Sequence, residues 1–419
     1  MTSLTITVHR GTQQIGGSCI EICHGNGERI ILDAGRPLDA PRNAPNLLPA
    51  SLDTNRPATV IFSHPHMDHW GLINELPPHW PLWTGDKSAE LMRLTTELFG
   101  GRIDREIHSW TSRSRPFRIG SFTITPYLTD HSAFDAYMLL IEGAGRRVLY
   151  TGDFRSHGRK ARLVERMMCT PPPNIDVLLM EGTNLGSDKP VITERELENQ
   201  FVALGKATPR HIFVQWSAQN IDRTVTLYRA AKRTGRMLVV DLYAADVLER
   251  AAGGTGVPRP SPAFDHLKVL ITPGGKRLYA RQNRDDFVTR MATGGSGTSR
   301  ARLANERAII MLRDTMLRDF QAGGLGLSSE DAYVFSNWSG YLDPADPATG
   351  WAQAAAAGAQ TLRLHTSGHA SAASLSAFAA AMAPAWLIPV HGTQWDCPGI
   401  ALPPVQRLRD GEPWQVPTL

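Results

Sequence analysis

The sequence is poor in cysteine, and its cysteines are not spaced as metal or redox motifs. Its four cysteines are Cys19, Cys23, Cys169 and Cys397, and no two of them form a CxxC pair. This spacing indicates neither a zinc ribbon nor a thiol redox site. It also indicates no disulfide framework, which is typical of proteins in a reducing compartment. We therefore expect a cytoplasmic protein.

Long apolar runs and lysine are scarce as well. No stretch is long and apolar enough to cross a bilayer, and the opening residues MTSLTITVHRGTQQIGG lack the pattern of a signal peptide. We therefore expect no membrane partner. Only seven of the 44 basic residues are lysine, and a net charge of +4 is too small to establish a polyanionic partner by itself.

What the chain does contain is enough apolar material for a large core. With 419 residues, 42% of them hydrophobic, it has the size of two or three domains. Residues 1–195 alternate short apolar runs with glycine turns, which predicts a region rich in strands. Residues 196–361 read as alternating strands and helices, which predicts a parallel sheet. Residues 362–419 again show the pattern of residues 1–195, with short apolar runs that predict strands.

The stretch SHPHMDHWG, residues 63–71, crowds ligand-type side chains behind a predicted strand. His64, His66, Asp68 and His69 occupy four of six consecutive positions. Side chains two apart in an extended loop project to the same side, so His64 and His66 can bind one cation. Imidazoles and carboxylates suit Zn²⁺, or Mn²⁺ in a more oxygen-rich site. A polar turn that caps a helix is the alternative, and this density makes it the weaker interpretation.

Four more ligand-type residues follow other apolar runs. They are Asp33 in IILDAG, His131 in LTDHSAFDA, Asp153 in VLYTGDF and His391 in LIPVHG. The end of a strand is a rigid place from which to hold a metal ligand. Each residue alone could equally be a turn residue or a cap. Together with the first cluster, they favour a metal centre.

These motifs resemble those of a known family. HPHMDH is similar to the HxHxDH metal motif of the metallo-β-lactamase fold. LLMEGTN with Glu181, TSGHA with His369 and PVHG with His391 resemble three further motifs of its β-CASP ribonuclease branch. The resemblance implies an α/β fold: a metallo-β-lactamase αββα sandwich from residues 1–195 and 362–419, with an inserted β-CASP domain, residues 196–361, built on a parallel sheet.

The resemblance also implies the ligands of two Zn²⁺ ions, with Mn²⁺ as an alternative. One zinc would take His64, His66 and His131. The other would take Asp68, His69 and His391, and Asp153 would bridge both. Asp33 would orient a ligand histidine from behind, a support that metal sites generally need.

A reaction follows from the same resemblance. A hydroxide between the metals would attack a phosphodiester in line, with Asp68 positioning it, and the product would carry a 5′-phosphate. His369, supported by Glu181, would stabilise or protonate the departing oxygen. Ser367 and Gly368 would hold phosphate together with His369. Whether cleavage is exonucleolytic or endonucleolytic stays open at this point.

The resemblance favours single-stranded RNA as substrate, because a histidine at position 391 goes with RNA in this family. The RNA would lie in the cleft between the domains, and a homodimer stays open. Tyr279 could stack a base, although a core position is the stronger interpretation. The basic runs that could contact RNA are Arg102, Arg105, Arg113 and Arg115; Arg155, Arg159, Lys160 and Arg162; and Lys276, Arg277, Arg281 and Arg284.

Three other functions are compatible with the fold alone. A DNA nuclease of repair or defence is disfavoured by His391. A hydrolase of small esters needs neither the large insertion nor the TSGHA motif. A non-catalytic scaffold subunit of an RNA-processing complex is disfavoured because all seven ligand positions carry ligand-type residues.

Overall fold

The protein forms two compact units in a computed structural model that describes residues 3–41 and 44–418. The first unit comprises Met1–Arg93, Ile103–Pro190 and Gly368–Leu419, and the second comprises Leu94–Arg102 and Val191–Ser367. The predicted boundaries at 195/196 and 361/362 therefore shift. They shift because Thr193 caps the first helix of the second unit, and because residues 360–363 pair with its sheet.

The first unit contains a seven-stranded sheet in the order β20-β1-β2-β3-β4-β5-β6. Its strands are β1 Leu4–Arg10, β2 Cys19–His24, β3 Arg29–Leu32, β4 Thr59–Ile61, β5 Leu82–Gly85, β6 Ile107–Trp110 and β20 Pro413–Gln415. Neighbours from β3 to β6 run parallel, whereas β1, β2 and β20 pair antiparallel. The carboxyl ends of β3 and β4 therefore lie at the same edge of the sheet.

A second sheet of the first unit has six strands in the order β19-β11-β10-β9-β8-β7. Its strands are β7 Phe117–Ile119, β8 Phe122–Leu128, β9 Tyr137–Gly143, β10 Arg146–Tyr150, β11 Val177–Glu181 and β19 Trp386–Val390. Pairing is parallel between β10 and β11 and between β11 and β19. These three strands also end at one common edge.

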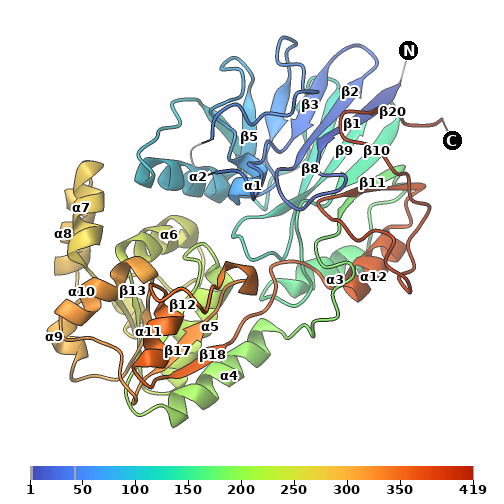
Figure 1. The fold of residues 1–419 in the computed structure, drawn as a ribbon. Helices are drawn as coiled ribbons and strands as arrows, with labels where there is room; N and C mark the ends of the chain where they lie inside the picture. The colour runs from blue at the N-terminus through green and yellow to red at the C-terminus, as the bar shows by residue number, and fades with distance from the viewer. Residues whose placement is uncertain (1–2, 42–43, 419) are drawn as a thin grey trace. The chain divides into compact units, whose positions relative to one another are not determined.

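The two sheets share one apolar core. Ile6, Ile22 and Leu32 of the first sheet pack in the same buried cluster as Leu139 and Leu179 of the second. On the outer face of the first sheet, Met92 of α2 joins a separate cluster, and on that of the second, α3 and α12 supply another. Figure 1 shows α3 and α12 close together. The layers are helix, sheet, sheet and helix, as predicted.

Four helices belong wholly or mainly to this unit. They are α1 Met67–Trp70, α2 Asp86–Leu98, α3 Ala161–Cys169 and α12 Ala372–Met382. The side chain of Asp135, on the loop after β8, accepts a hydrogen bond from the Ser88 amide in the first turn of α2. Its carboxylate thereby satisfies an amide that the helix start leaves unpaired.

The second unit is built on a seven-stranded sheet in which every pairing is parallel. The order is β15-β14-β13-β16-β12-β17-β18. Its strands are β12 Ile212–Gln215, β13 Met237–Val240, β14 Leu267–Leu270, β15 Gly297–Thr298, β16 Ala308–Met311, β17 Ala332–Phe335 and β18 Gln360–Arg363. The predicted parallel sheet is confirmed.

Helices connect these strands. They are α4 Glu194–Ala207, α5 Ile221–Arg233, α6 Leu242–Ala252, α7 Pro273–Arg281, α8 Asp285–Thr293, α9 Arg300–Leu303, α10 Leu317–Ala322 and α11 Gly350–Ala356, with 3₁₀ turns η1 Pro262–Phe264, η2 Asp314–Met316 and η3 Ser339–Tyr341. None of the helices in the described part of the chain combines the length and apolar character that crossing a bilayer requires.

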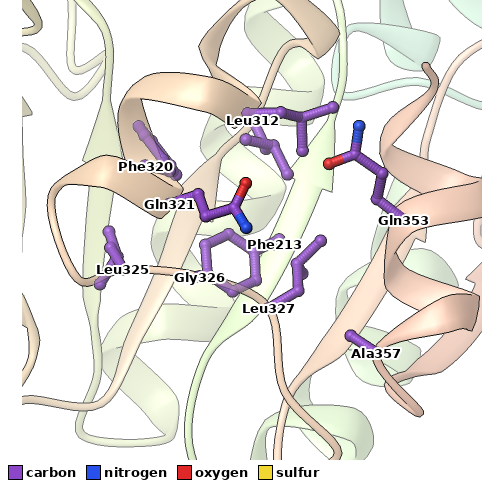
Figure 2. A pocket seen from close by; sticks show the side chains of 10 residues that line it. Phe213, Leu312, Phe320, Gln321, Leu325, Gly326, Leu327, Gln353 and Ala357 are labelled. Atoms are coloured by element: carbon purple, nitrogen blue, oxygen red, sulfur yellow. The ribbon is translucent and has the colours of Figure 1, made fainter.

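A small cavity of about 140 Å³ lies between β12, α10 and α11. Phe213, Phe320 and Leu325 form apolar walls, and Figure 2 shows the Gln321 and Gln353 side chains on two sides of the space. The cavity contains no acid, base or nucleophile. Its residues supply nothing for catalysis, so the functional site is elsewhere.

His211, at the start of the strand β12, is buried in an unusual way. Its side chain is fully buried, and neither ring nitrogen has a hydrogen-bond partner. Burial, together with the positive charge of Arg210, lowers the pKa of His211 to about 4. The imidazole is therefore neutral in the folded protein, whereas in the unfolded chain it gains a proton below its ordinary pKa of 6.5.

This burial predicts a loss of stability in mild acid. Because the unfolded state binds the extra proton, burial of His211 should lower the free energy of unfolding as the pH falls. The decrease should be about 1 kcal/mol between about pH 7.5 and about pH 5.5, and about 3 kcal/mol by about pH 4. Denaturant unfolding of parent and His211→Leu at several pH values measures the difference. The exposed His79→Gln serves as control. Equal pH slopes for parent and His211→Leu would contradict the prediction.

Candidate metal centre

The ligand-type residues come from the ends of strands that share an edge. His64 and His66 follow β4, and Asp68 and His69 lie on the short helix α1 directly behind them. In the second sheet, His131 follows β8, Asp153 follows β10 and His391 follows β19. Because β10 and β19 run parallel to the same neighbour, their ends meet, and the sequence positions that were predicted as ligands converge.

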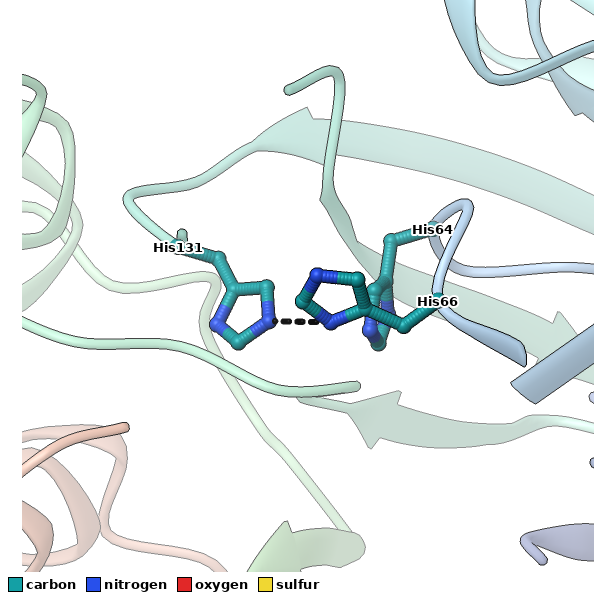
Figure 3. A group of neighbouring side chains, drawn as sticks. All are labelled: His64, His66 and His131. Atoms are coloured by element: carbon teal, nitrogen blue, oxygen red, sulfur yellow. Dashed lines mark hydrogen bonds between the residues drawn. The ribbon is translucent and has the colours of Figure 1, made fainter. Parts of the chain in front are cut away.

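His64, His66 and His131 form the first group, shown in Figure 3. One ring nitrogen from each lies within 4.8 Å of the others, and His66 Nδ1 is 3.1 Å from His131 Nε2. Burial lowers the pKa of His66 to about 4 and holds those of His64 and His131 well below the ordinary value. All three imidazoles are therefore neutral, which is the form that binds metal.

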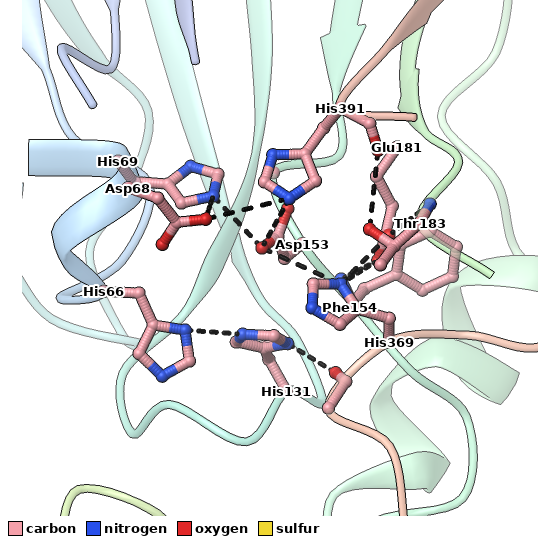
Figure 4. A network of polar contacts seen from close by, with 12 residues as sticks. His66, Asp68, His69, His131, Asp153, Phe154, Glu181, Thr183, His369 and His391 are labelled. Atoms are coloured by element: carbon pink, nitrogen blue, oxygen red, sulfur yellow. Dashed lines mark hydrogen bonds and ion pairs between the residues drawn. The ribbon is translucent and has the colours of Figure 1, made fainter. Parts of the chain in front are cut away.

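Asp68, His69, Asp153 and His391 form the second group, seen with its neighbours in Figure 4. The Asp153 carboxylate lies 3.1 Å from His69 Nε2 and 3.7 Å from His391 Nε2. It also lies 3.6 Å from Nε2 of His64 in the first group. Asp153 thus belongs to the second group and also borders His64 of the first, and its role as a bridging ligand stays a prediction.

The atoms that point into this centre lack hydrogen bonds. Nε2 of His64, His69 and His391 and Oδ1 of Asp153 are buried without a hydrogen-bond partner. Burying such atoms is costly unless something compensates them. Imidazole and carboxylate donors fit divalent metals, so the cluster makes a divalent metal site.

Asp33 supports this centre from behind, as predicted. Its Oδ2 lies 2.7 Å from Nδ1 of His69, and it accepts hydrogen bonds from Tyr150 Oη and from the amide and hydroxyl of Ser63. The Ser63 hydroxyl donates its hydrogen bond to Asp33. The Ser63 oxygen therefore accepts a hydrogen bond from Nδ1 of His64, which is 3.0 Å away. Nε2 of each ring is therefore the atom that faces a metal. Burial would lower the pKa of His69, but the carboxylates of Asp153, Asp68 and Asp33 raise it well above its ordinary value, so this imidazole must release a proton when it binds a metal.

Three of these supporting groups were not predicted. They are Ser63, Ser18, which pairs with Nδ1 of His391 at 3.0 Å, and the Gly368 carbonyl, which accepts from Nδ1 of His131 at 2.6 Å. Ser63 directly precedes His64, which is a signal that could have revealed it. Ser18 and Gly368 lie far along the chain from their partners, and no local pattern indicates them.

His369 and Glu181 lie beside the second group. His369 Nδ1 is 3.1 Å from Glu181 Oε2 and 3.8 Å from Asp153 Oδ2. Glu181 is fully buried and also accepts from the Phe154 amide at 2.9 Å. Burial alone would lower the pKa of His369, but the carboxylates of Glu181 and Asp153 raise it to about 9. A charged imidazole thus borders the centre.

The residues predicted to hold phosphate separate between the two units. Gly368 lies in the first unit, where its carbonyl binds His131, and a Cβ at this position would come within 2.5 Å of Ser132 Oγ. Ser367 lies in the second unit. Their role toward phosphate stays a prediction.

Several basic residues from the runs that could contact RNA make structural contacts instead. Arg155 is fully buried and pairs with Asp130 at 3.5 Å. Arg105 donates to the carbonyls of residues 73, 76 and 80. Arg284 forms an ion pair with the buried Asp246. Positive charge in the sequence could not distinguish these roles.

Lys160 and Tyr279 also point inward. Lys160 Nζ is a buried atom that stands 5.7 Å from the centroid of the Phe134 ring. Tyr279 is fully buried, and its hydroxyl donates to the carbonyl of Leu242. Tyr279 is therefore a core residue, the stronger of the two interpretations made from the sequence.

Comparison with known proteins identifies this part of the chain. Residues 13–194 match the model of the Metallo-beta-lactamase superfamily. The chain contains a metallo-β-lactamase domain. The matched segment includes Asp33, both halves of the metal centre up to Asp153, and Glu181. The predicted resemblance to this fold is confirmed.

Three curated relatives of this chain carry ribonuclease names. Ribonuclease J of Sinorhizobium meliloti is 22% identical over 84% of this chain and 62% of its own length. Ribonuclease TTHA0252 of Thermus thermophilus is 24% identical, with 47% of each chain covered. An RNase J-like protein of Methanocaldococcus jannaschii is 28% identical, with 46% of each covered. The chain thus spans about half to three fifths of these relatives.

One solved structure matches the whole fold. A crystal structure of a protein of unknown function from Enterococcus faecalis V583 superposes with a TM-score of 0.80. The alignment covers 99% of this chain and 100% of that one, at 19% sequence identity. The two-unit architecture around the metallo-β-lactamase domain therefore also occurs in a second protein.

The support that Asp33 gives to the metal centre can be tested by metal binding. Asp33 has a φ of +61°, which asparagine tolerates, so Asp33→Asn should keep the backbone but lose the acceptor for His69. Affinity for Zn²⁺ should fall about 10- to 100-fold. Competition with a chromophoric chelator measures it. The exposed Asp39→Asn is the control, and parent-like affinity in Asp33→Asn would contradict the assigned role.

Proposed function

We propose that this chain is a two-metal hydrolase that cleaves phosphodiester bonds of RNA. The observation that carries the proposal is the division of seven ligand-type side chains into two groups, with Asp153 of the second lying 3.6 Å from His64 of the first. Two cations about 3.5–4 Å apart are suited to displacement at phosphorus, because they act on both the attacking and the leaving oxygen. The donor set favours two Zn²⁺ ions, with Mn²⁺ as the alternative.

Bound cations would supply an activated water and offset the negative charge of the phosphate. The residues of the chain do the rest. Asp68, at the rim of the second group, is the least buried ligand-type side chain there and is placed to orient the attacking water. Asp33, Ser18 and Ser63 hold their histidines in one tautomer and one orientation.

His369 is the group we assign to the departing oxygen. Glu181 binds its Nδ1, so Nε2 is the ring atom directed away from that carboxylate. The ring lies outside the two groups that hold the seven predicted ligands, although with Asp153 and Glu181 it forms a third group of ligand-type atoms within 4.8 Å of one another. An imidazolium there can donate a hydrogen bond or a proton as the bond to the leaving oxygen breaks. The product would keep the phosphate on its 5′ end.

RNA is the substrate that the relatives favour, since three of them carry ribonuclease names. A single strand is the expected form, and the cytoplasm the expected location. His391 also supports RNA, because in the family that these motifs resemble a histidine at this position goes with RNA.

A cleavage assay tests the proposal. The parent with added Zn²⁺ or Mn²⁺ should cleave a single-stranded RNA to 5′-phosphate products, and an Asp68→Ala/His69→Ala variant should not. RNA labelled at its 5′ end, carrying either a 5′-monophosphate or a 5′-triphosphate, distinguishes exonucleolytic from endonucleolytic cleavage. Early release of mononucleotides indicates an exonuclease, and internal fragments indicate an endonuclease. A matched DNA and a small ester are the controls. Cleavage of DNA or ester with RNA left intact would overturn the proposal.

The role of His369 makes a separate prediction. His369→Gln should lower kcat about 10²- to 10⁴-fold, because it removes the proton donor. Metal content measured by mass spectrometry should stay as in the parent, because we assign the metals to the two groups that hold the seven predicted ligands and not to the third group, which His369 forms with Asp153 and Glu181. Glu181→Gln should show a smaller loss of the same kind. If His369→Gln loses metal instead, His369 is a ligand and this assignment is wrong.

A further inference from the structure

The second unit exposes two large aromatic side chains beside one another. Trp338 is 57% exposed and Tyr341 is 71% exposed. Their ring centroids are 5.2 Å apart, and the rings are nearly perpendicular at 87°. Large exposed aromatic residues mark sites where a partner covers them.

The local backbone holds the Trp338 ring in place. A Cβ on Gly340 would come within 2.2 Å of the indole, so the ring lies directly over the backbone of the turn η3. Glycine at this position allows the close approach. The indole is therefore a supported surface that stays 57% exposed, with the Tyr341 ring set perpendicular to it, which suits a stacking platform.

A basic surface lies on the helix α7. Lys276, Arg277 and Arg281 are exposed and, at 100° per residue, fall on one side of the helix, whereas Tyr279 is buried on another. None of the three forms an ion pair with any residue that the structure describes. The neighbouring arginines Arg284 and Arg290 are paired, with Asp246 and Glu249.

Both features stand at the same edge of the parallel sheet. The helix α7 follows the carboxyl end of β14, and Trp338 follows the carboxyl end of β17. Four strand spacings separate β14 from β17 in the sheet order, about 20 Å. Figure 1 shows α7 and α8 together next to α6. In open α/β sheets, ligands bind at the carboxyl edge of the strands.

We propose that this edge of the second unit binds single-stranded RNA. Trp338, with Tyr341, stacks a base, and the α7 face, defined by Lys276, Arg277 and Arg281, contacts the phosphate backbone. Aromatic platforms combined with unpaired cations are how proteins bind single strands, because every base has a π-face and every nucleotide a phosphate. The inference rests on the proposed function and names the surface that would hold the RNA beyond the bond that is cut.

Binding and cleavage of RNAs of two lengths test the surface. The probes are single-stranded RNAs of about four and about 24 nucleotides, long enough in the second case to cover the edge. Trp338→Ala should weaken binding of the long RNA about tenfold, and Trp338→Phe should restore most of it. Binding is measured by fluorescence anisotropy with an Asp68→Asn background that prevents cleavage. Cleavage rates are measured with Asp68 in place.

The contribution of the α7 face can be measured separately, through the salt dependence of RNA affinity. Lys276→Gln/Arg277→Gln/Arg281→Gln should lower the slope of log affinity against log salt by about 2, because three phosphate contacts are lost. A Lys206→Gln/Lys232→Gln variant removes exposed charges from α4 and α5 and should behave as the parent. Cleavage of the short RNA should be unchanged in all of these variants.

The outcomes separate this inference from the proposed function. Parent-like affinity and salt slope in both the Trp338 and the α7 variants would overturn the inference while leaving RNA cleavage intact. A parent that neither binds nor cleaves either RNA would overturn both. If the variants lose cleavage of the short RNA to the same degree as that of the long one, the residues act on the metal centre and the surface is wrong.

Discussion

The buried carboxylate of Asp153 is the interaction on which the rest of the site depends. It lies within 4 Å of the Nε2 atoms of His64, His69 and His391 and of Nδ1 of His369. An isolated charge in such a place would cost several kcal/mol. Burial raises the pKa of Asp153, but the surrounding histidines outweigh that effect and hold it well below its ordinary value. The carboxylate stays ionised and available to a divalent cation.

Holding seven side chains around one carboxylate requires a rigid frame, which the two sheets provide. Parallel pairing brings the ends of β10, β11 and β19 to one edge, and β3 and β4 end together in the other sheet. Immediately after β3 and β19, Asp33 and His391 adopt φ values of +61° and +50°. Non-glycine residues rarely occupy this region, and such strain persists only where the surroundings over-determine it. Here the hydrogen bonds of Asp33 and the pairing of His391 with Ser18 do so.

The fold and the ligand positions were predictable because they follow from local patterns. Each ligand is a polar residue soon after an apolar run, and parallel or mixed sheets collect such positions at one edge. Tertiary partners such as Ser18 and the Gly368 carbonyl were not predictable, since they stand far along the chain from the histidines they hold. Charge was the poorest guide: Arg155 and Lys276 look alike in the sequence, yet one is buried against Asp130 and the other exposed. The second domain boundary differs from the predicted one because β18 adds to the parallel sheet of the second unit.

One hydrogen bond has a consequence for how this protein can evolve. The Gly368 carbonyl holds His131, and the next residue is His369, so a two-residue segment serves both the first ligand group and the histidine that pairs with Glu181. A substitution or insertion there would disturb metal retention and chemistry at once, and a side chain on residue 368 would strike Ser132. New substrate preferences can therefore be acquired only with difficulty near the centre. Divergence between relatives should accumulate instead in loops such as the one carrying Trp338, which can vary without cost to the metals.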